Sequence, residues 1–316
     1  IDALASLSRA LLANGETDGA ESNFRTMAKV AGYDSPILLQ IAKSQIALEK
    51  FNDAHWSLKK AVKGDPRYLP AQAELILLYA LMGEEEKAFK RAAGIQLLYP
   101  DLALGYALTG DLLNQAGRFD EAATAFAQGL EREPLPELAL RRYLAKMRTV
   151  GSDPDSQSAA VSELEQWAKT HPESLDAFRT LGSGYIAVGR IGDAQKLFQV
   201  LLKNLPDDAA VYNNLAVTAI KAKDPKALEY ARKAHELAPK EPTVLDTLGW
   251  VLVQTGDAGR ALRYLRDASL RASREPEIRY HLGVALHRLG RDSEAQQHLK
   301  SALKNGQAFD GIENAR

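Results

Sequence analysis

The chain has 316 residues, of which 46% are hydrophobic and 7% aromatic, and 40 basic residues nearly balance 41 acidic ones. A formal net charge of −1 gives no bulk electrostatic attraction to nucleic acid or to an anionic membrane, so nucleic-acid binding is not expected. Cysteine is absent, which excludes disulfides, thiolate nucleophiles and cysteine-ligated metals within these residues. No apolar run approaches the roughly 18 residues that a membrane-spanning helix requires, so no transmembrane segment is expected.

A spacing of about 34 residues runs through the chain. The Leu-Gly pair at 248–249 recurs at 282–283, and a matching pair at 181–182 lies nearly two periods earlier. A unit of this size is too small to bury its apolar face alone, so neighbouring units must stack. The expected repeats are 1–34, 35–68, 69–102, 103–136, about 137–174, 175–208, 209–241, 242–275 and 276–309.

The residue types that recur at fixed places predict two helices in each unit. A small glycine or alanine at the eighth and twentieth places lets two helices approach closely. A glycine near the fifteenth place, such as Gly189, favours the left-handed conformation that ends the first helix. Aspartates that follow, as in Asp193, suit the start of the second helix, and proline near the thirty-second place ends it.

This pattern resembles the tetratricopeptide repeat family over essentially the whole chain. The resemblance implies an all-α fold, a right-handed superhelix of about nine helical hairpins over residues 1–309. The residues Asp310-Gly311-Ile312-Glu313 look like a capping box that opens a C-terminal capping helix at 310–316. The start at Ile1, already in phase with the repeat, suggests a processed chain or a piece of a longer one.

One irregularity stands out in the fifth repeat. The segment Gly151-Ser152-Asp153-Pro154-Asp155-Ser156 lengthens the loop between two helices by about three residues. It is either a tolerated surface insertion or a hinge or contact loop.

No group of residues suggests catalysis, a cofactor or a metal. The Gly182-Ser183-Gly184 segment falls inside an expected helix and lacks the preceding strand of a dinucleotide site. The spacing of six between His281 and His287 does not place both on one helical face, as metal ligands would require. We therefore expect a protein that is not an enzyme and holds no cofactor.

The resemblance implies a concave groove lined by places two, five, six, nine, twelve and thirteen of each first helix. In repeats seven to nine these places hold hydrogen-bonding and aromatic residues: Asn213, Asn214, Asp246, Thr247, Trp250, Gln254, Tyr280, His281, His287 and Arg288. Trp250 is the best candidate anchor for a peptide or a sugar, because its ring is both apolar and able to donate a hydrogen bond. The alternative is that Trp250 and Tyr280 only pack against the neighbouring repeat.

A small positive patch is expected from Arg142, Lys146 and Arg179 in repeats five and six. It would bind an acidic segment or an anionic sugar, or else form a solvated face with local glutamate partners. The residues around Asn214 do not reproduce the lysine and asparagine set with which co-chaperones of this family hold a C-terminal carboxylate. A cytosolic chaperone clamp is therefore disfavoured.

Residues 244–252, VLDTLGWVL, and 276–282, PEIRYHL, with Gly306-Gln307-Ala308-Phe309, resemble the C-terminal repeats of tetratricopeptide lipoproteins. The lipoproteins in question belong to the bacterial exosortase/PEP-CTERM sorting and exopolysaccharide system. The resemblance implies a protein-binding scaffold, periplasmic or anchored to the outer membrane, with protein, peptide or polysaccharide-system partners. The alternatives are a cytoplasmic scaffold, self-association through exposed helix faces, or the substrate-presenting arm of a larger glycosyltransferase or polysaccharide-export porin.

Overall fold

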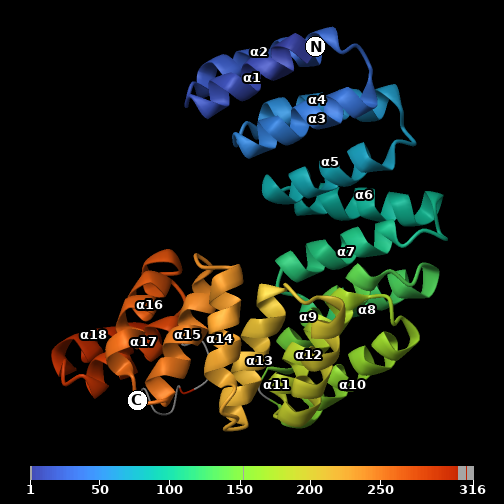
Figure 1. Cartoon of the computed structure of the whole chain (residues 1–316). Coiled ribbons are helices and arrows are strands. Elements are labelled where there is room, and N and C mark those ends of the chain that lie inside the picture. The colour runs from blue at the N-terminus through green and yellow to red at the C-terminus, as the bar shows by residue number, and fades with distance from the viewer. Residues whose placement is uncertain (1, 152, 305–310, 312–316) are drawn as a thin grey trace. The chain divides into compact units, whose positions relative to one another are not determined.

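The computed structural model describes residues 2–151, 153–304 and 311, and every regular element in them is a helix (Figure 1). The chain divides into two compact units, unit 1 from Ile1 to Asp153 and unit 2 from Pro154 to Arg316. The all-helical fold of stacked hairpins expected from the sequence is confirmed. None of the described helices is both long and apolar enough to cross a membrane.

Unit 1 is a stack of helical hairpins in which each pair packs against the next (Figure 1). The last helix of the unit, α9, packs against the second helix of the hairpin before it. Its helices are α1 (Asp2–Ala13), α2 (Thr17–Val30), α3 (Ser35–Ala47), α4 (Phe51–Gly64), α5 (Leu69–Leu81), α6 (Glu85–Leu98), α7 (Leu104–Gln115), α8 (Phe119–Arg132) and α9 (Pro136–Val150).

Unit 2 begins with α10 and continues with four hairpins. The first helices of these hairpins, α11, α13, α15 and α17, also contact one another in sequence, so they form a continuous row. The helices of unit 2 are α10 (Pro154–Thr170), α11 (Leu175–Ala187), α12 (Ile191–Asn204), α13 (Ala209–Lys221), α14 (Ala227–Leu237), α15 (Pro242–Gln254), α16 (Ala258–Arg271), α17 (Pro276–Arg288) and α18 (Asp292–Leu303).

The turn inside most hairpins depends on one residue in the left-handed conformation. Gly189, which follows α11, has φ 75° and lets the chain reverse into α12 without a clash from a side chain. Lys223 occupies the same position after α13 with φ 57°, because the sequence offers no glycine there. Asp208 begins α13 by accepting hydrogen bonds from the backbone N–H groups of Ala210 and Val211, at 2.9 and 3.0 Å.

The expected close approach of paired helices is seen at the eighth-place glycines. A Cβ atom added to Gly182 on α11 would lie 2.4 Å from the ring of Phe198 on α12. Gly110 on α7 meets Phe126 on α8 in the same way, also at 2.4 Å. Both phenylalanine rings are among the most deeply buried side chains of the protein. The glycine therefore provides the space that its partner's ring fills.

Two predictions from the sequence concern the loop of the fifth repeat and the C-terminal end of the repeats. The expected lengthening of the loop in the fifth repeat is wrong: α9 ends at Val150 and α10 begins at Pro154, the same separation as between Ala187 and Ile191 in the next hairpin. The added residues extend the helices instead, to 15 in α9 and 17 in α10, and the division between the units falls at Asp153. The capping-box residues Asp310, Ile312 and Glu313, and the segment 306–309, lie outside the described residues. The capping helix at 310–316 and the exact repeat boundaries therefore stay predictions.

Replacing Gly110 with alanine tests this packing. The new methyl group has no room beside Phe126, so Gly110→Ala should lower the free energy of unfolding by about 1–3 kcal/mol despite alanine's better helix propensity. Gly94→Ala on α6 is the matched control, because its Cβ would meet no atom within 4 Å. That control should stabilise unit 1 by up to about 1 kcal/mol. Urea unfolding followed by circular dichroism measures both, and equal effects would refute the packing role.

Candidate functional site

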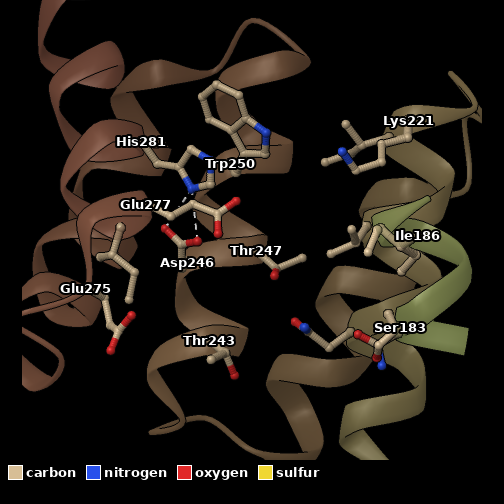
Figure 2. A pocket seen from close by; sticks show the side chains of 16 residues that line it. Ser183, Ile186, Lys221, Thr243, Asp246, Thr247, Trp250, Glu275, Glu277 and His281 are labelled. Carbon is tan, nitrogen blue, oxygen red and sulfur yellow. Dashed lines mark hydrogen bonds and ion pairs between the residues drawn. The ribbon is translucent and has the colours of Figure 1, made fainter. Parts of the chain in front are cut away.

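A pocket of about 650 Å³ lies along the row of first helices in unit 2 (Figure 2). Its volume is in the range of pockets that hold small molecules or peptide side chains. The lining residues come from α11, α13, α15 and α17 and from the residue before α17: Ser183, Ile186, Ala187, Asn213, Asn214, Val217, Ile220, Lys221, Thr243, Asp246, Thr247, Trp250, Glu275, Glu277, Ile278 and His281.

The helical period explains why these residues share one surface. On α13, Asn213, Val217 and Lys221 are spaced four residues apart, so their side chains lie on the same face of the helix. Thr243, Asp246, Thr247 and Trp250 repeat this arrangement on α15. Because consecutive first helices pack directly on one another, the faces join into one hollow.

A buried hydrogen-bonded pair forms one wall of the pocket. His281 on α17 meets Asp246 on α15 through Nδ1, at 2.9 and 3.0 Å from the two carboxylate oxygens. The residues are only 5% and 8% exposed, so their contact is shielded from water. An ionised carboxylate only accepts hydrogen bonds, so the imidazole carries its hydrogen on Nδ1 and donates it. This contact ties two consecutive repeats together at the pocket.

Trp250 lies on the imidazole of this pair. The two rings are stacked, with centroids 4.1 Å apart and planes inclined by 17°. The indole is half-buried and remains part of the pocket lining. Asp246 fixes His281, and His281 supports Trp250, so the indole is a preorganised apolar surface rather than a mobile side chain.

Asn213 contributes a half-buried amide side chain to the lining. Its Oδ1 atom is buried and has no hydrogen-bond partner among the described residues, so it faces the protein rather than the open hollow. Asn214 and Thr247 add polar groups beside it.

Opposite charges lie at opposite sides of the pocket. Figure 2 shows Glu275 and Glu277 on the side of Asp246, and Lys221 across the hollow. Both glutamates are exposed. Because the pair of Asp246 and His281 adds a further carboxylate, acidic groups outnumber basic ones in the lining.

Six of the residues expected from the sequence lie together in this pocket: Asn213, Asn214, Asp246, Thr247, Trp250 and His281. Tyr280 does not line it. Its side chain is only 5% exposed and packs with Ala302 of α18, near Trp250, so it belongs to the hydrophobic core. The packing alternative describes Tyr280 better than a groove role does.

Other expected groove residues also have partners elsewhere. Arg288 donates to the backbone carbonyl of Val253, and exposed His287 pairs through Nδ1 with Asp292 at 2.7 Å. Gln254 ends α15 and is not among the lining residues.

The expected positive patch divides between the two units. Arg142 and Lys146 are half-buried on α9 of unit 1. Arg179 is on α11 of unit 2, where it forms ion pairs with Asp176 and Asp208. Its charge is therefore largely neutralised by its own unit, as the solvated-face alternative expected.

Several lining residues occupy the groove places two, nine, twelve and thirteen but were not among the candidate residues predicted from the sequence. Counted from the expected repeat starts, Lys221 is at place thirteen of repeat seven and Glu277 at place two of repeat nine. Ser183 and Ile186 are at places nine and twelve of repeat six. Applying the six places without preference for aromatic and amide residues would have found them. Glu275, which precedes its helix, carries no such signal.

The arrangement supplies recognition rather than an evident reaction. An aspartate that orients an imidazole occurs in acyl-transfer sites, where the histidine activates a hydroxyl. Here the Ser183 hydroxyl donates instead to the carbonyl of Arg179, at 3.2 Å. Within the described ranges no three histidine, aspartate or glutamate side chains gather as a metal site.

The buried pair predicts an unequal effect of two aspartate substitutions in unit 2. Asp246→Ala leaves the His281 N–H buried without its acceptor, so the free energy of unfolding should fall by about 1–3 kcal/mol. Asp176→Ala removes an exposed ion pair with Arg179 and should cost less than about 1 kcal/mol. Chemical unfolding of both variants checks this, and an equally small loss for both would show that the buried pair adds no stability.

Comparisons with known proteins agree with the helical repeats of the fold. The tetratricopeptide repeat family model matches residues 179–242 and 247–308. The TPR repeat-containing protein PA4667 of Pseudomonas aeruginosa is 28% identical over 148 residues, which is 46% of this chain. The match covers 25% of that relative, so the chain spans about a quarter of its length.

Two solved structures resemble the chain at low sequence identity. Cut9-Hcn1, a hetero-tetramer of the APC/C, aligns with a TM-score of 0.60 and 16% identity, covering 94% of this chain and 58% of that one. A tetratricopeptide repeat protein from Parabacteroides merdae aligns with 0.58 and 14%, covering 81% and 100%. These likenesses show the fold alone. Residues 179–242 and 247–308 are thus tetratricopeptide repeats, in a chain whose helical hairpins have the fold of solved proteins of that kind.

Proposed function

We propose that the chain is a non-enzymatic protein-interaction scaffold and that the unit 2 pocket holds a segment of a partner protein. Tetratricopeptide repeats bind proteins or peptides, and the row of first helices here presents a hollow of suitable size. The observation that carries the proposal is the stacking of Trp250 on His281, whose imidazole is hydrogen-bonded to Asp246. A rigid indole in a concave surface is the typical anchor of a protein interface.

The lining indicates what the partner segment presents. The half-buried amides of Asn213 and Asn214 suit a segment whose backbone or side-chain amides can hydrogen-bond with them. Ile186, Ile220 and Ile278 provide apolar contacts for a side chain that covers the indole.

The charges fix an orientation for that segment. A lysine or arginine of the segment belongs at the side of the exposed Glu275. This arrangement replaces the earlier expectation that Arg179 steers acidic partners to the groove, because Arg179 is paired within its own unit.

The setting that we propose is the bacterial cell envelope, in protein sorting or exopolysaccharide biogenesis. The support is the resemblance of residues 244–252 and 276–282 to the repeats of lipoproteins of that system. In this proposal the full-length protein is periplasmic or anchored to the outer membrane, and polysaccharide-system proteins are its partners. Cell fractionation with an antibody against the native protein tests the location, and recovery in the cytoplasm would contradict it.

Site-specific cross-linking tests the pocket as the binding surface. Thr243 is exposed and lines the pocket, so a photoreactive phenylalanine analogue at this position should cross-link a partner in the native host. Mass spectrometry of the product gives the partner's sequence, from which the contacting segment can be synthesised. Trp250→Ala should weaken binding of that synthetic segment by about tenfold to hundredfold, as expected for a central aromatic anchor.

Two further variants separate the pocket from the fold. Asn213→Ala removes a half-buried amide from the lining and should weaken binding without loss of helicity. Trp56→Ala removes a half-exposed tryptophan of unit 1 and is the matched control, with no expected effect on binding. Substitution of Asp246 or Tyr280 is unsuitable here, because both side chains are buried and their loss would destabilise the fold. Unchanged affinity of Trp250→Ala would contradict the proposal.

A further inference from the structure

A second hollow, of about 420 Å³, lies between α5 and α6 of unit 1. It involves residues that neither the expected groove nor the unit 2 pocket includes. Three cationic side chains of α6, Lys87, Lys90 and Arg91, line it together with Tyr79 of α5. None of the lining residues is acidic. Its charge is therefore opposite to that of the unit 2 pocket.

The cations are arranged around an aromatic ring. Lys87 and Arg91 lie one helical turn apart and approach the Tyr79 ring, at 5.6 and 5.9 Å from its centroid. Arg91 also donates from Nη1 to the Oε1 atom of Gln72, at 2.9 Å, which holds the guanidinium in place. Glu84, in the turn before α6, forms an ion pair with Lys87. Lys87 and Lys90 are both exposed, so their ammonium groups are accessible to a ligand.

The imidazole of His55 reports the electrostatic character of this region. Its Nε2 atom lies 3.2 Å from the Tyr79 hydroxyl. Burial is the main cause that lowers the pKa of His55 below its ordinary value, and Lys59 is the next. Lys87 and Arg91 lower this pKa further, whereas Glu84 opposes them. Together, the charges around His55 lower its pKa, so the electrostatic environment of this imidazole is positive.

The floor and rim of the hollow are apolar and open. A Cβ atom added to Gly94 would meet no atom within 4 Å, so a ligand can approach the α6 backbone there. Leu98, one turn further along, is 74% exposed and lines the hollow, so it presents an apolar side chain that a ligand can cover. The occupant therefore offers both negative charge and an apolar side chain.

We propose that this hollow is a second docking site, for an acidic segment of a partner protein that carries a leucine-like side chain. The carboxylates of the segment pair with Lys90 and Arg91, and its apolar side chain covers Gly94 and Leu98. A hollow between two helices fits a chain segment better than it fits the flat surface of an anionic membrane. The protein thus joins an acidic segment in unit 1 to a differently charged segment in unit 2.

A blocking variant with a matched control tests the site in the full chain. The probe is a fluorescein-labelled peptide, Glu-Leu-Glu-Glu-Leu-Glu-Glu-Leu, and fluorescence anisotropy measures its binding. Gly94→Trp fills the hollow and should weaken binding at least about tenfold. Ala93→Trp adds the same side chain to an exposed position outside the lining and should leave the affinity unchanged. Circular dichroism confirms that both variants keep their helicity.

Charge is tested separately. Lys90→Glu should weaken the binding of the peptide about tenfold. Lys203→Glu on α12 changes the net charge equally and should have little effect. In the wild-type protein, the bound acidic peptide should raise the pKa of His55, followed by NMR of the imidazole protons. Trp250→Ala should not alter any of these results, so failure of this site is distinguishable from failure of the unit 2 pocket.

Several outcomes would overturn the proposal. One is that wild-type protein does not bind the peptide, or binds equally a peptide with lysine in place of glutamate. Another is binding to phosphatidylserine vesicles that Gly94→Trp abolishes while peptide binding persists, which would identify a membrane surface as the occupant. A third is a dimer by sedimentation that Gly94→Trp converts to monomer, which would assign the hollow to a second copy of the chain.

Discussion

The close approach of two helices within each hairpin is the constraint on which the binding surfaces depend. Where glycine occupies the eighth place, as at Gly182 and Gly249, the partner helix places a phenylalanine or leucine directly against the backbone. That contact fixes the rotation of the first helix about its own axis, because any other face would remove the space for the ring. With the rotation fixed in successive hairpins, residues four apart along α13 and α15 must point into the same hollow.

The pocket wall in unit 2 shows how a buried polar pair can support a recognition surface. Taking the Asp246 carboxylate out of water is costly, and the His281 N–H offsets part of that cost by donating to it. Because the two residues come from consecutive first helices, the contact also sets the spacing between repeats. Trp250 then stacks on an imidazole that cannot rotate, so a ligand that covers the indole orders few side chains on binding.

The period predicted the fold because it comes from local packing, in which each place in the repeat meets the same neighbours. It predicted the pocket wherever that condition holds, as for Asn213 and Trp250. It failed for Tyr280, because that side chain packs against Ala302 of α18 and lies beside Gly311. Arg142 was placed from an approximate repeat start, but α9 begins at Pro136, and one residue turns a side chain by about 100° around the helix. The groove places did not predict the unit 1 hollow, because they lie on the first helix of each hairpin and the cations of this hollow lie on α6, a second helix.

A formal net charge of −1 argues against a bulk field but says nothing about local ones. The unit 2 pocket contains an excess of carboxylates, and the unit 1 hollow contains only cations among its charged lining residues. At physiological salt, exposed charges act over only about 8 Å, so the charges that line a hollow act mainly on the ligand bound in it. Charges of opposite sign are thus concentrated in different hollows of a nearly neutral chain. A scaffold that holds two segments of unlike charge gains from this arrangement, because each segment is disfavoured at the other's site.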